Sequence, residues 1–411
     1  MNSAAARQDA DAVAPVLVAG GGPVGSALAL ALGRAGIPVT LLDAATGGGD
    51  APAELRPIAL SASSERILRT LDVWPLLEPD AEPIRTVHVS ERGRFGVVRL
   101  RASELGVDAL GQVADAGSIA RALDRSLDGC TRVRRMRPAT VAAVEPGDGR
   151  ARVRMASAGA DLDAMLVVAA DGAQSLLRES LGVAVHSREY RQHAVVCNVT
   201  PGVAHRQVAY ERFTPGGPVA LLPLADARCG LVWTLDENRA AEVAGCDDAG
   251  FLLLLQECFG NRLGRLQAAS PRSTFALSLV RSESVTARRC VLIGNAANQL
   301  HPVAGQGLNL GLRDAAVLAE MVARAVRRGL DPGDPGLLAE YSRRRRRDQD
   351  SVVRFTDALA RGFTAGPPAL GVLRGAGLLA LDLVPAAGRA FARRAMGLAG
   401  PQPRLVRGLL P

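Results

Sequence analysis

The sequence predicts an α/β fold in which a parallel-sheet domain is interrupted by a β-rich domain and followed by a helical C-terminal tail. Three observations carry this prediction. Strand, glycine-rich turn, helix and strand patterns follow one another within the first fifty residues. Residues 190–285 then change to the alternation typical of antiparallel strands, and the stretch 294–311 returns the chain to α/β character. The length of 411 residues fits two domains.

These changes of pattern also predict the domain boundaries. Segments such as YERFTPGGPVALLPL and ARCGLVWTL alternate apolar and polar residues between Pro-Gly turns, which indicates an antiparallel sheet. The expected segments are, for the interrupted domain, 1–80, 105–188 and 282–345; for the β-rich domain, 81–104 and 189–281; and for the helical, basic C-terminal region, 346–411.

The N-terminal glycine-rich turn has the order expected of a dinucleotide site. The apolar strand Val16–Ala19 runs into GGGPVG, in which Gly20, Gly22 and Gly25 form G-x-G-x-x-G. The first glycine permits the turn, the second admits a pyrophosphate, and the third lets helix pack on strand. Asp43 ends the second strand, where a carboxylate can bind ribose hydroxyls. A dinucleotide site is therefore expected, although the motif alone does not separate NAD from FAD.

A second candidate phosphate or ribose site follows an apolar strand at 165–170. There Asp171 and a glycine precede a short helix that carries Arg178. The elements between the two sites are expected to be a loop and an amphipathic helix at 56–80, a short helix at 118–127 and a hairpin at 133–154.

The stretch GNAANQLHPVAGQGLNLG at 294–311 is rich in glycine, which has no side chain to cover its backbone. It contains four glycines, several amide side chains and one His-Pro pair, and it lies between the apolar run 290–293 and a helix-like segment. We expect it to form a loop that leads into a helix.

Composition excludes several classes of protein and of chemistry. The chain has no lysine, which excludes a Schiff-base lysine, a phosphate-loop lysine and a lysine base. Its six cysteines are scattered, so reduced thiols and no metal site are expected. Aromatic residues make up only 3%, so nucleic acid is a poor candidate partner. Because no signal peptide or membrane-spanning run is evident, we expect a cytoplasmic location.

Three motifs, in their order and spacing, resemble the FAD-dependent aromatic hydroxylases of the p-hydroxybenzoate hydroxylase type: GGGPVG, ADGAQSLLR at 170–178 and the stretch at 294–311. The resemblance extends from about residue 15 to the end of the chain. RPIALS at 56–61 and YERFTPGGPVALLPL at 210–224 are similar to the ubiquinone-biosynthesis branch, and within it to 2-polyprenyl-6-methoxyphenol hydroxylases. This chain departs from the usual family pattern in having Asn295 for Asp and Asn298 for His.

The resemblance implies a bound FAD, with the late loop against the flavin and the N–H groups near Gly307 facing its reduced ring. Asn295 keeps the oxygen acceptor that the family uses for the ribityl chain; the alternative is that it caps a turn. Arg56 matches a position near the flavin, with a solvated surface Arg as the alternative. The expected FAD-binding residues are Gly20, Gly22, Pro23, Val24, Gly25, Asp43, Arg56, Arg121, Asp171, Arg178, Asn295, Gly305, Gln306, Gly307, Leu308 and Asn309.

The resemblance further implies that NAD(P)H reduces FAD and that O2 forms a flavin C4a-hydroperoxide, which hydroxylates the ring of a polyprenylated phenol. A base that ionises the phenol would help. His301, which directly precedes Pro302, is one candidate, with a structural histidine as an equal alternative. Tyr210 is a second candidate at the pocket, with a core aromatic role as the alternative.

The positive charge of the chain is concentrated at its C-terminus. Residues 343–411 have 13 Arg and 4 Asp, a balance of +9, whereas the whole chain is +8. This region is expected to contact a membrane surface at the inner face, other ubiquinone-biosynthesis proteins, or an apolar patch of the FAD domain. Rival functions are hydroxylation at another ring position or of a non-prenylated phenol, a prenyl reductase, and a non-catalytic flavoprotein scaffold.

Overall fold

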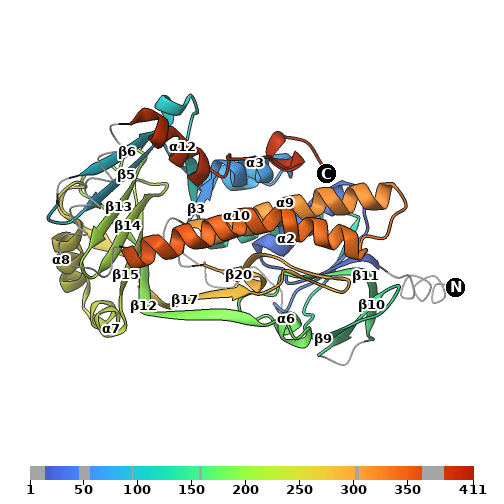
Figure 1. Ribbon diagram of the computed structural model, residues 1–411. Helices are drawn as coiled ribbons and strands as arrows, with labels where there is room; N and C mark the ends of the chain where they lie inside the picture. The colour runs from blue at the N-terminus through green and yellow to red at the C-terminus, as the bar shows by residue number, and fades with distance from the viewer. Residues whose placement is uncertain (1–13, 46–55, 95, 157–159, 301–304, 363–383) are drawn as a thin grey trace.

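The computed structural model describes residues 14–45, 56–94, 96–156, 160–300, 305–362 and 384–411. Within these ranges, two large sheets lie at opposite ends of an elongated molecule (Figure 1). One sheet is largely parallel and carries helices on its faces, and the other is largely antiparallel. The predicted fold class is confirmed.

The first sheet has parallel strands at its centre. Its strands are β18 (Thr286–Ala287), β19 (Cys290–Leu292), β11 (Leu162–Ala169), β1 (Ala14–Ala19), β2 (Val39–Leu42) and β8 (Val133–Met136) in spatial order, with β10 (Ala151–Met155) and β9 (Val141–Pro146) added beside β11. Val16, Leu17 and Val18 of the central β1 are completely buried, as expected for a parallel strand covered on both faces. The predicted hairpin is formed by β9 and β10 alone, because β8 joins the parallel strands.

Helix α9 (Gln306–Arg327) packs against both α2 (Pro23–Arg34) and α10 (Pro335–Gly362) beside this sheet (Figure 1). The interface of α9 with α10 contains one fully buried ion pair and one partly buried ion pair. Arg345 Nε lies 2.6 Å from Asp314 Oδ1, and Arg313 Nε lies 2.9 Å from Asp348 Oδ2. Part of the C-terminal arginine run is therefore neutralised inside the protein, where removal of one partner would leave a buried charge.

A small three-stranded sheet connects the two large ones. It comprises β3 (Pro57–Ser61), β7 (Gly111–Asp115) and β4 (Glu82–Ile84). The neighbouring parts of the chain form α3 (Ala62–Thr70), α4 (Trp74–Leu77), η1 (Glu78–Asp80), η2 (Ala102–Leu105) and α5 (Ala116–Asp128), whereas α6 (Leu176–Ser180) packs on β9 of the first sheet. The loop expected from residue 56 is thus a strand, which pairs with β7 rather than with a sequence neighbour.

The second sheet provides the wall that faces the first. Its strands in spatial order are β20 (Asn298–Gln299), β17 (Ser273–Ser282), β12 (Val185–Thr200), β15 (Cys229–Asp236), β14 (Gly217–Pro223), β13 (Val208–Thr214), β5 (Thr86–Glu91) and β6 (Val97–Arg101), with β16 (Ala268–Ala269) beside β12. Two helices that the sequence interpretation missed, α7 (Glu237–Gly245) and α8 (Asp248–Phe259), cover its outer face (Figure 1).

The C-terminal segment packs onto the body of the protein. Helix α12 (Pro385–Ala395) contributes Ala392 and Met396, at its end, to an apolar cluster with Val98 of β6 and Val113 of β7. The N–H of Ser63 donates to the carbonyl of Met396, at 3.0 Å. Short helix η5 (Arg404–Arg407) then packs on α3 and α9. Of the expected roles, coverage of an apolar patch is the one these contacts show.

Candidate active site

The first glycine-rich turn connects β1 with α2. Gly20 has a φ of +117°, which residues with a Cβ rarely adopt, and a Cβ on Gly25 would lie 2.0 Å from the carbonyl oxygen of Gly20. A Cβ on Gly22 would instead meet no atom within 4 Å. Gly22, Pro23 and Val24 line a cavity. The turn is closed toward the sheet and open toward the cavity, as a backbone cradle for phosphate requires.

The start of α9 faces the same cavity. The helix begins after Gly305, and the lining includes the whole of 305–309. A Cβ on Gly307 would meet no atom within 4 Å. The first N–H groups of a helix lack intrahelical acceptors, and no acidic residue occupies this first turn. This helix end therefore presents positive partial charge to the cavity.

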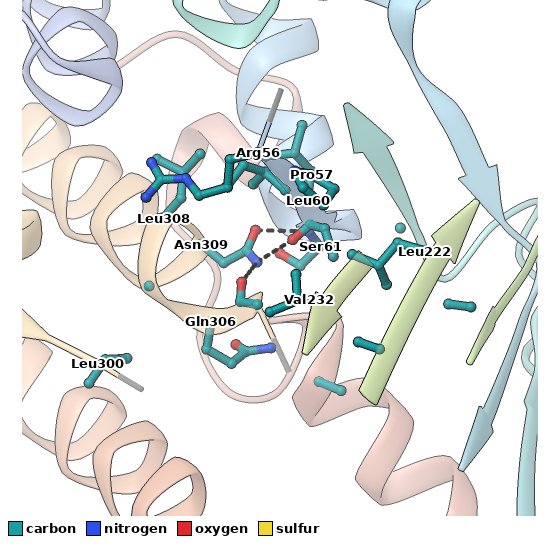
Figure 2. A pocket seen from close by; sticks show the side chains of 18 of the residues that line it. Arg56, Pro57, Leu60, Ser61, Leu222, Val232, Leu300, Gln306, Leu308 and Asn309 are labelled. Atoms are coloured by element: carbon teal, nitrogen blue, oxygen red, sulfur yellow. Dashed lines mark hydrogen bonds between the residues drawn. The ribbon is translucent and has the colours of Figure 1, made fainter. Parts of the chain in front are cut away.

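The side chain of Asn309 holds the start of α9 against β3 and α3. Its Oδ1 accepts hydrogen bonds from Ser61 N at 2.8 Å and from Ser64 Oγ at 2.7 Å. Its Nδ2 donates to Ala59 O at 2.8 Å and to Gly305 O at 2.6 Å. Figure 2 shows Asn309 bonded to its neighbours at the edge of the cavity, Ser61 among them. We call the four hydrogen bonds of this side chain the Asn309 latch. The side-chain amide of Asn309 is thus used to fix the helix start. The predicted contact of Asn309 with FAD would have to come from its backbone, and it stays a prediction.

The cavity has a volume of about 700 Å³ and connects the two glycine-rich segments with the second sheet. Figure 2 shows Leu222 and Val232 of that sheet across from Gln306 and Leu308 of α9. The far wall is apolar and is completed by α12. The residues of this wall include Ile84, Val87, Val89, Val98, Leu100, Leu110, Leu222, Phe391 and Met396.

Two polar side chains line the cavity near the glycine-rich segments. Asn295, in the short helix η3 (Gly294–Ala296), is exposed and has no hydrogen-bond partner among the described residues. Its amide is available to a ligand, which favours the cofactor role over the turn-cap alternative. Arg56 is also exposed to the cavity, with its guanidinium carbon 5.7 Å from the ring centre of Phe275.

These features fit an extended dinucleotide that carries a ring system. The open glycine backbones suit a diphosphate at one end, and the helix start suits an electron-rich ring at the other. Comparison with known proteins agrees. A family model described as an FAD binding domain matches residues 13–356.

Curated relatives match almost the whole chain. Ubiquinone hydroxylase UbiL of Rhodospirillum rubrum is 36% identical, with 97% of this chain and 94% of the relative covered. 3-Demethoxyubiquinol 3-hydroxylase of Escherichia coli is 30% identical, with coverages of 93% and 98%. The chain belongs to the ubiquinone hydroxylase family of FAD-dependent monooxygenases.

A solved structure shares the fold of this ubiquinone hydroxylase family member. The p-nitrophenol 4-monooxygenase PnpA of Pseudomonas putida superimposes with a TM-score of 0.78 at 20% identity, covering 95% of this chain and 99% of that one. The protein is a flavin-dependent aromatic hydroxylase that uses FAD and NAD(P)H. These predictions are confirmed, and the narrower likeness to 2-polyprenyl-6-methoxyphenol hydroxylases stays a prediction.

The predicted ribose carboxylate lies beside the first glycine-rich turn. A Cβ on Gly21 would lie 2.3 Å from Asp43 Cγ, so Asp43 is directly behind the turn. Arg137 Nε donates to Asp43 Oδ2 at 2.7 Å. The sequence interpretation missed Arg137, because a pair separated by 94 residues leaves no local signal. The other carboxylate oxygen, Asp43 Oδ1, accepts a hydrogen bond from Ala45 N at 3.1 Å. The contact of Asp43 with ribose remains a prediction.

The other predicted FAD-binding side chains form contacts within the protein. Asp171 accepts from Ser175 Oγ at 2.6 Å and from Leu177 N at 3.2 Å, which fixes the start of α6. Arg178 donates to Ala296 O at 3.0 Å and so connects α6 with η3. Arg121 lies 3.6 Å from the carboxylate of Asp80, on the protein surface and outside the cavity lining.

The predicted catalytic residues separate in space. His301 and Pro302 lie outside the described residues. Tyr210 borders the cavity, but its ring packs between His88 and Phe259, at centroid distances of 5.4 and 5.5 Å. This contact places the Tyr210 ring on the α8 side of the second sheet, as in the core aromatic alternative. Its catalytic role stays a prediction.

The sequence interpretation also missed Glu211, which follows Tyr210 in β13 and lines the cavity. Neighbouring residues of a strand point to opposite faces, so Glu211 faces the cavity while the Tyr210 ring faces α8. The signal was present as a lone glutamate between alternating apolar residues, in the segment that carried the family likeness. Of the described residues, Arg56 and Glu211 are the charged ones in the lining.

Proposed function

We propose that this ubiquinone hydroxylase family member hydroxylates the aromatic ring of a polyprenylated phenol in ubiquinone biosynthesis, with NAD(P)H and O2 as co-substrates. One observation supports the proposal above all. A single cavity joins the two glycine-rich segments to a long apolar wall that ends at α12. A phenol with an isoprenoid chain matches the polarity of this cavity, because its polar ring would lie near the cofactor and its chain against the apolar side chains.

The protein contributes binding, orientation and exclusion of water. The backbone at Gly22 and the amide of Asn295 would hold FAD, and the start of α9 would stabilise negative charge on a flavin ring bound near Gly307. When bound, FAD supplies the two-electron chemistry that activates O2. The Asn309 latch keeps the α9 start in place, and the apolar wall excludes water from the reacting ring.

The C-terminal region suits a substrate that resides in a membrane. The inner side of α12 lines the cavity, whereas Arg389, Arg393 and Arg394 are exposed on the outer side. An anionic lipid surface or another ubiquinone-biosynthesis protein would meet this positive charge where α12 covers the cavity. No helix among the described residues has the length and apolar character to cross a bilayer. Because of the exposed arginines of α12, we propose peripheral contact with the membrane from the cytoplasmic side.

The relatives and the sequence motifs both favour ubiquinone precursors but point to different reactions. The E. coli relative is named as a 3-hydroxylase of demethoxyubiquinol, whereas the sequence motifs are similar to 2-polyprenyl-6-methoxyphenol hydroxylases. Deletion of the gene and mass spectrometry of the accumulated quinone precursor would identify the ring position. A precursor that lacks a ring hydroxyl supports the proposal, and an unchanged quinone profile contradicts it.

Purified protein provides the direct test. The yellow, FAD-loaded protein should consume NAD(P)H and O2 faster when a short-chain prenylphenol is present, and should release a catechol or hydroquinone. A non-catalytic scaffold would bind FAD yet show no phenol-dependent consumption of NAD(P)H. That result would overturn the proposed function.

A further inference from the structure

The cavity-facing side of the second sheet is almost entirely apolar, and Glu211 interrupts it. Glu211 pairs with Ala220 of β14 on one side and with Val89 of β5 on the other. Both neighbours also line the cavity, as do Ala209 and Phe213 two residues away along β13. A carboxyl group at the centre of such a surface is costly unless it has a function or a partner.

No described residue provides that partner. Glu211 has no hydrogen bond or ion pair within the described part of the chain. Arg212, the next residue of β13, and His88, on the neighbouring β5, lie outside the lining, and His88 packs against the Tyr210 ring on the opposite face. Arg56 is the charged residue that shares the cavity, and it borders the cofactor end. The arginines of α12 are exposed on its outer side.

This environment changes the acidity of the carboxyl group. Burial in apolar surroundings raises the pKa of Glu211 to about 7, because the charged form loses its water. Near neutral pH the residue is therefore partly ionised and is a stronger base than an exposed glutamate. Catalytic bases with this function are tuned in the same way.

We propose that Glu211 is a catalytic residue that accepts the hydroxyl proton of the phenol substrate. The phenol O–H bond breaks, an O–H bond forms on the carboxylate, and the electron pair stays on the phenolate oxygen. The ring is then electron-rich when it receives oxygen, and the carboxylic acid returns the proton to the same oxygen before the product leaves. This inference rests on the proposed function, because it requires a phenol in the cavity.

Glu211 has a geometric advantage over the neighbouring candidate on its strand. The Tyr210 ring is held between His88 and Phe259 on the other face of the sheet. Burial also raises the pKa of the Tyr210 hydroxyl above its usual value of 10.0, so it stays protonated at neutral pH. Arg56 remains a cation and cannot accept a proton.

The first test compares Glu211→Gln and Glu211→Asp with Glu257→Gln, which removes an exposed carboxylate from α8. In the wild type, kcat/KM for hydroxylation should rise with pH through about 7, as the Glu211 carboxyl ionises. Glu211→Gln should lose this rise and about 100-fold or more of kcat. Glu211→Asp should keep the rise at a lower rate, and Glu257→Gln should match the wild type.

Substrate acidity separates a proton acceptor from a merely structural residue. A fluorinated phenol ionises more readily, so the deficit of Glu211→Gln should shrink when it replaces the parent phenol. An equal deficit for both phenols would contradict the proposal. So would a Glu211→Gln variant that retains the wild-type rate and pH dependence.

A binding measurement tests the same contact without turnover. The phenol can donate a hydrogen bond to Glu211, whereas its methyl ether cannot, so the FAD-loaded wild type should bind the phenol at least 10-fold more tightly. Glu211→Gln should lose most of this preference, and an unchanged preference would overturn the inference. If the wild type shows no phenol-dependent NAD(P)H oxidation at all, the proposed function has failed, not only the role of Glu211.

Discussion

The Asn309 latch predicts a large loss of stability from a single small substitution. Asn309 is 1% exposed, and its side chain makes four hydrogen bonds that connect α9 with β3 and α3. Asn309→Ala removes all four and leaves the buried groups of Ser61 and Ser64 without this partner. At a net contribution of about 1 kcal/mol each, we expect the free energy of unfolding to fall by roughly 3–4 kcal/mol. The corresponding decrease in Tm is on the order of 6–8 °C.

The chain offers a matched control for this variant. Asn198 is also buried, at 4% exposure, but neither its side-chain oxygen nor its nitrogen has a partner among the described residues. Asn198→Ala should therefore change the free energy of unfolding by about 1 kcal/mol or less. Urea unfolding followed by circular dichroism measures both variants. The reasoning is wrong if Asn309→Ala is no more destabilising than Asn198→Ala.

Two further predictions concern the glycine-rich turn and a buried histidine. Gly25→Ala should abolish FAD retention, because the new Cβ would lie 2.0 Å from Gly20 O. The control Gly129→Ala should retain FAD, because its Cβ would meet no atom within 4 Å. The flavin absorbance of the purified proteins measures the difference. Burial, reinforced by Arg262, lowers the pKa of His88 from 6.5 to about 4, so the unfolded chain binds the proton first. The free energy of unfolding should fall as pH drops from about 6.5 to 4, by roughly 2 kcal/mol at pH 5. His88→Phe should lose this component in urea titrations, and an unchanged pH dependence would contradict it.

The parts of the site that sequence revealed are those where backbone chemistry limits the choice of residue. Gly20 and Gly25 are predictable because the turn allows no Cβ at either position. The helix after Gly305 is predictable because a glycine loop precedes a long apolar-periodic segment. These local requirements leave a pattern in any sequence that satisfies them.

Other parts depend on residues that meet only in the folded chain. The pair of Asp43 and Arg137 spans 94 residues, and the bond from Ser61 to Asn309 spans 248. Such contacts leave no periodic trace. The missed helices α7 and α8 did leave local signals, since Asp236 and Asp247 cap them by accepting from backbone N–H groups. The strong strand pattern on either side outweighed those caps.

Because helix α12 closes the cavity, a functional form of this protein has to extend well beyond the last glycine motif. The helix shares an apolar cluster with the strands that line the cavity, so removing it would uncover Val98 and Leu100 to solvent. A chain truncated before α12 would admit water to the cavity and expose an apolar surface that promotes aggregation. The basic C-terminal segment therefore forms part of the cavity wall, and a truncation or fusion at this end has to preserve α12.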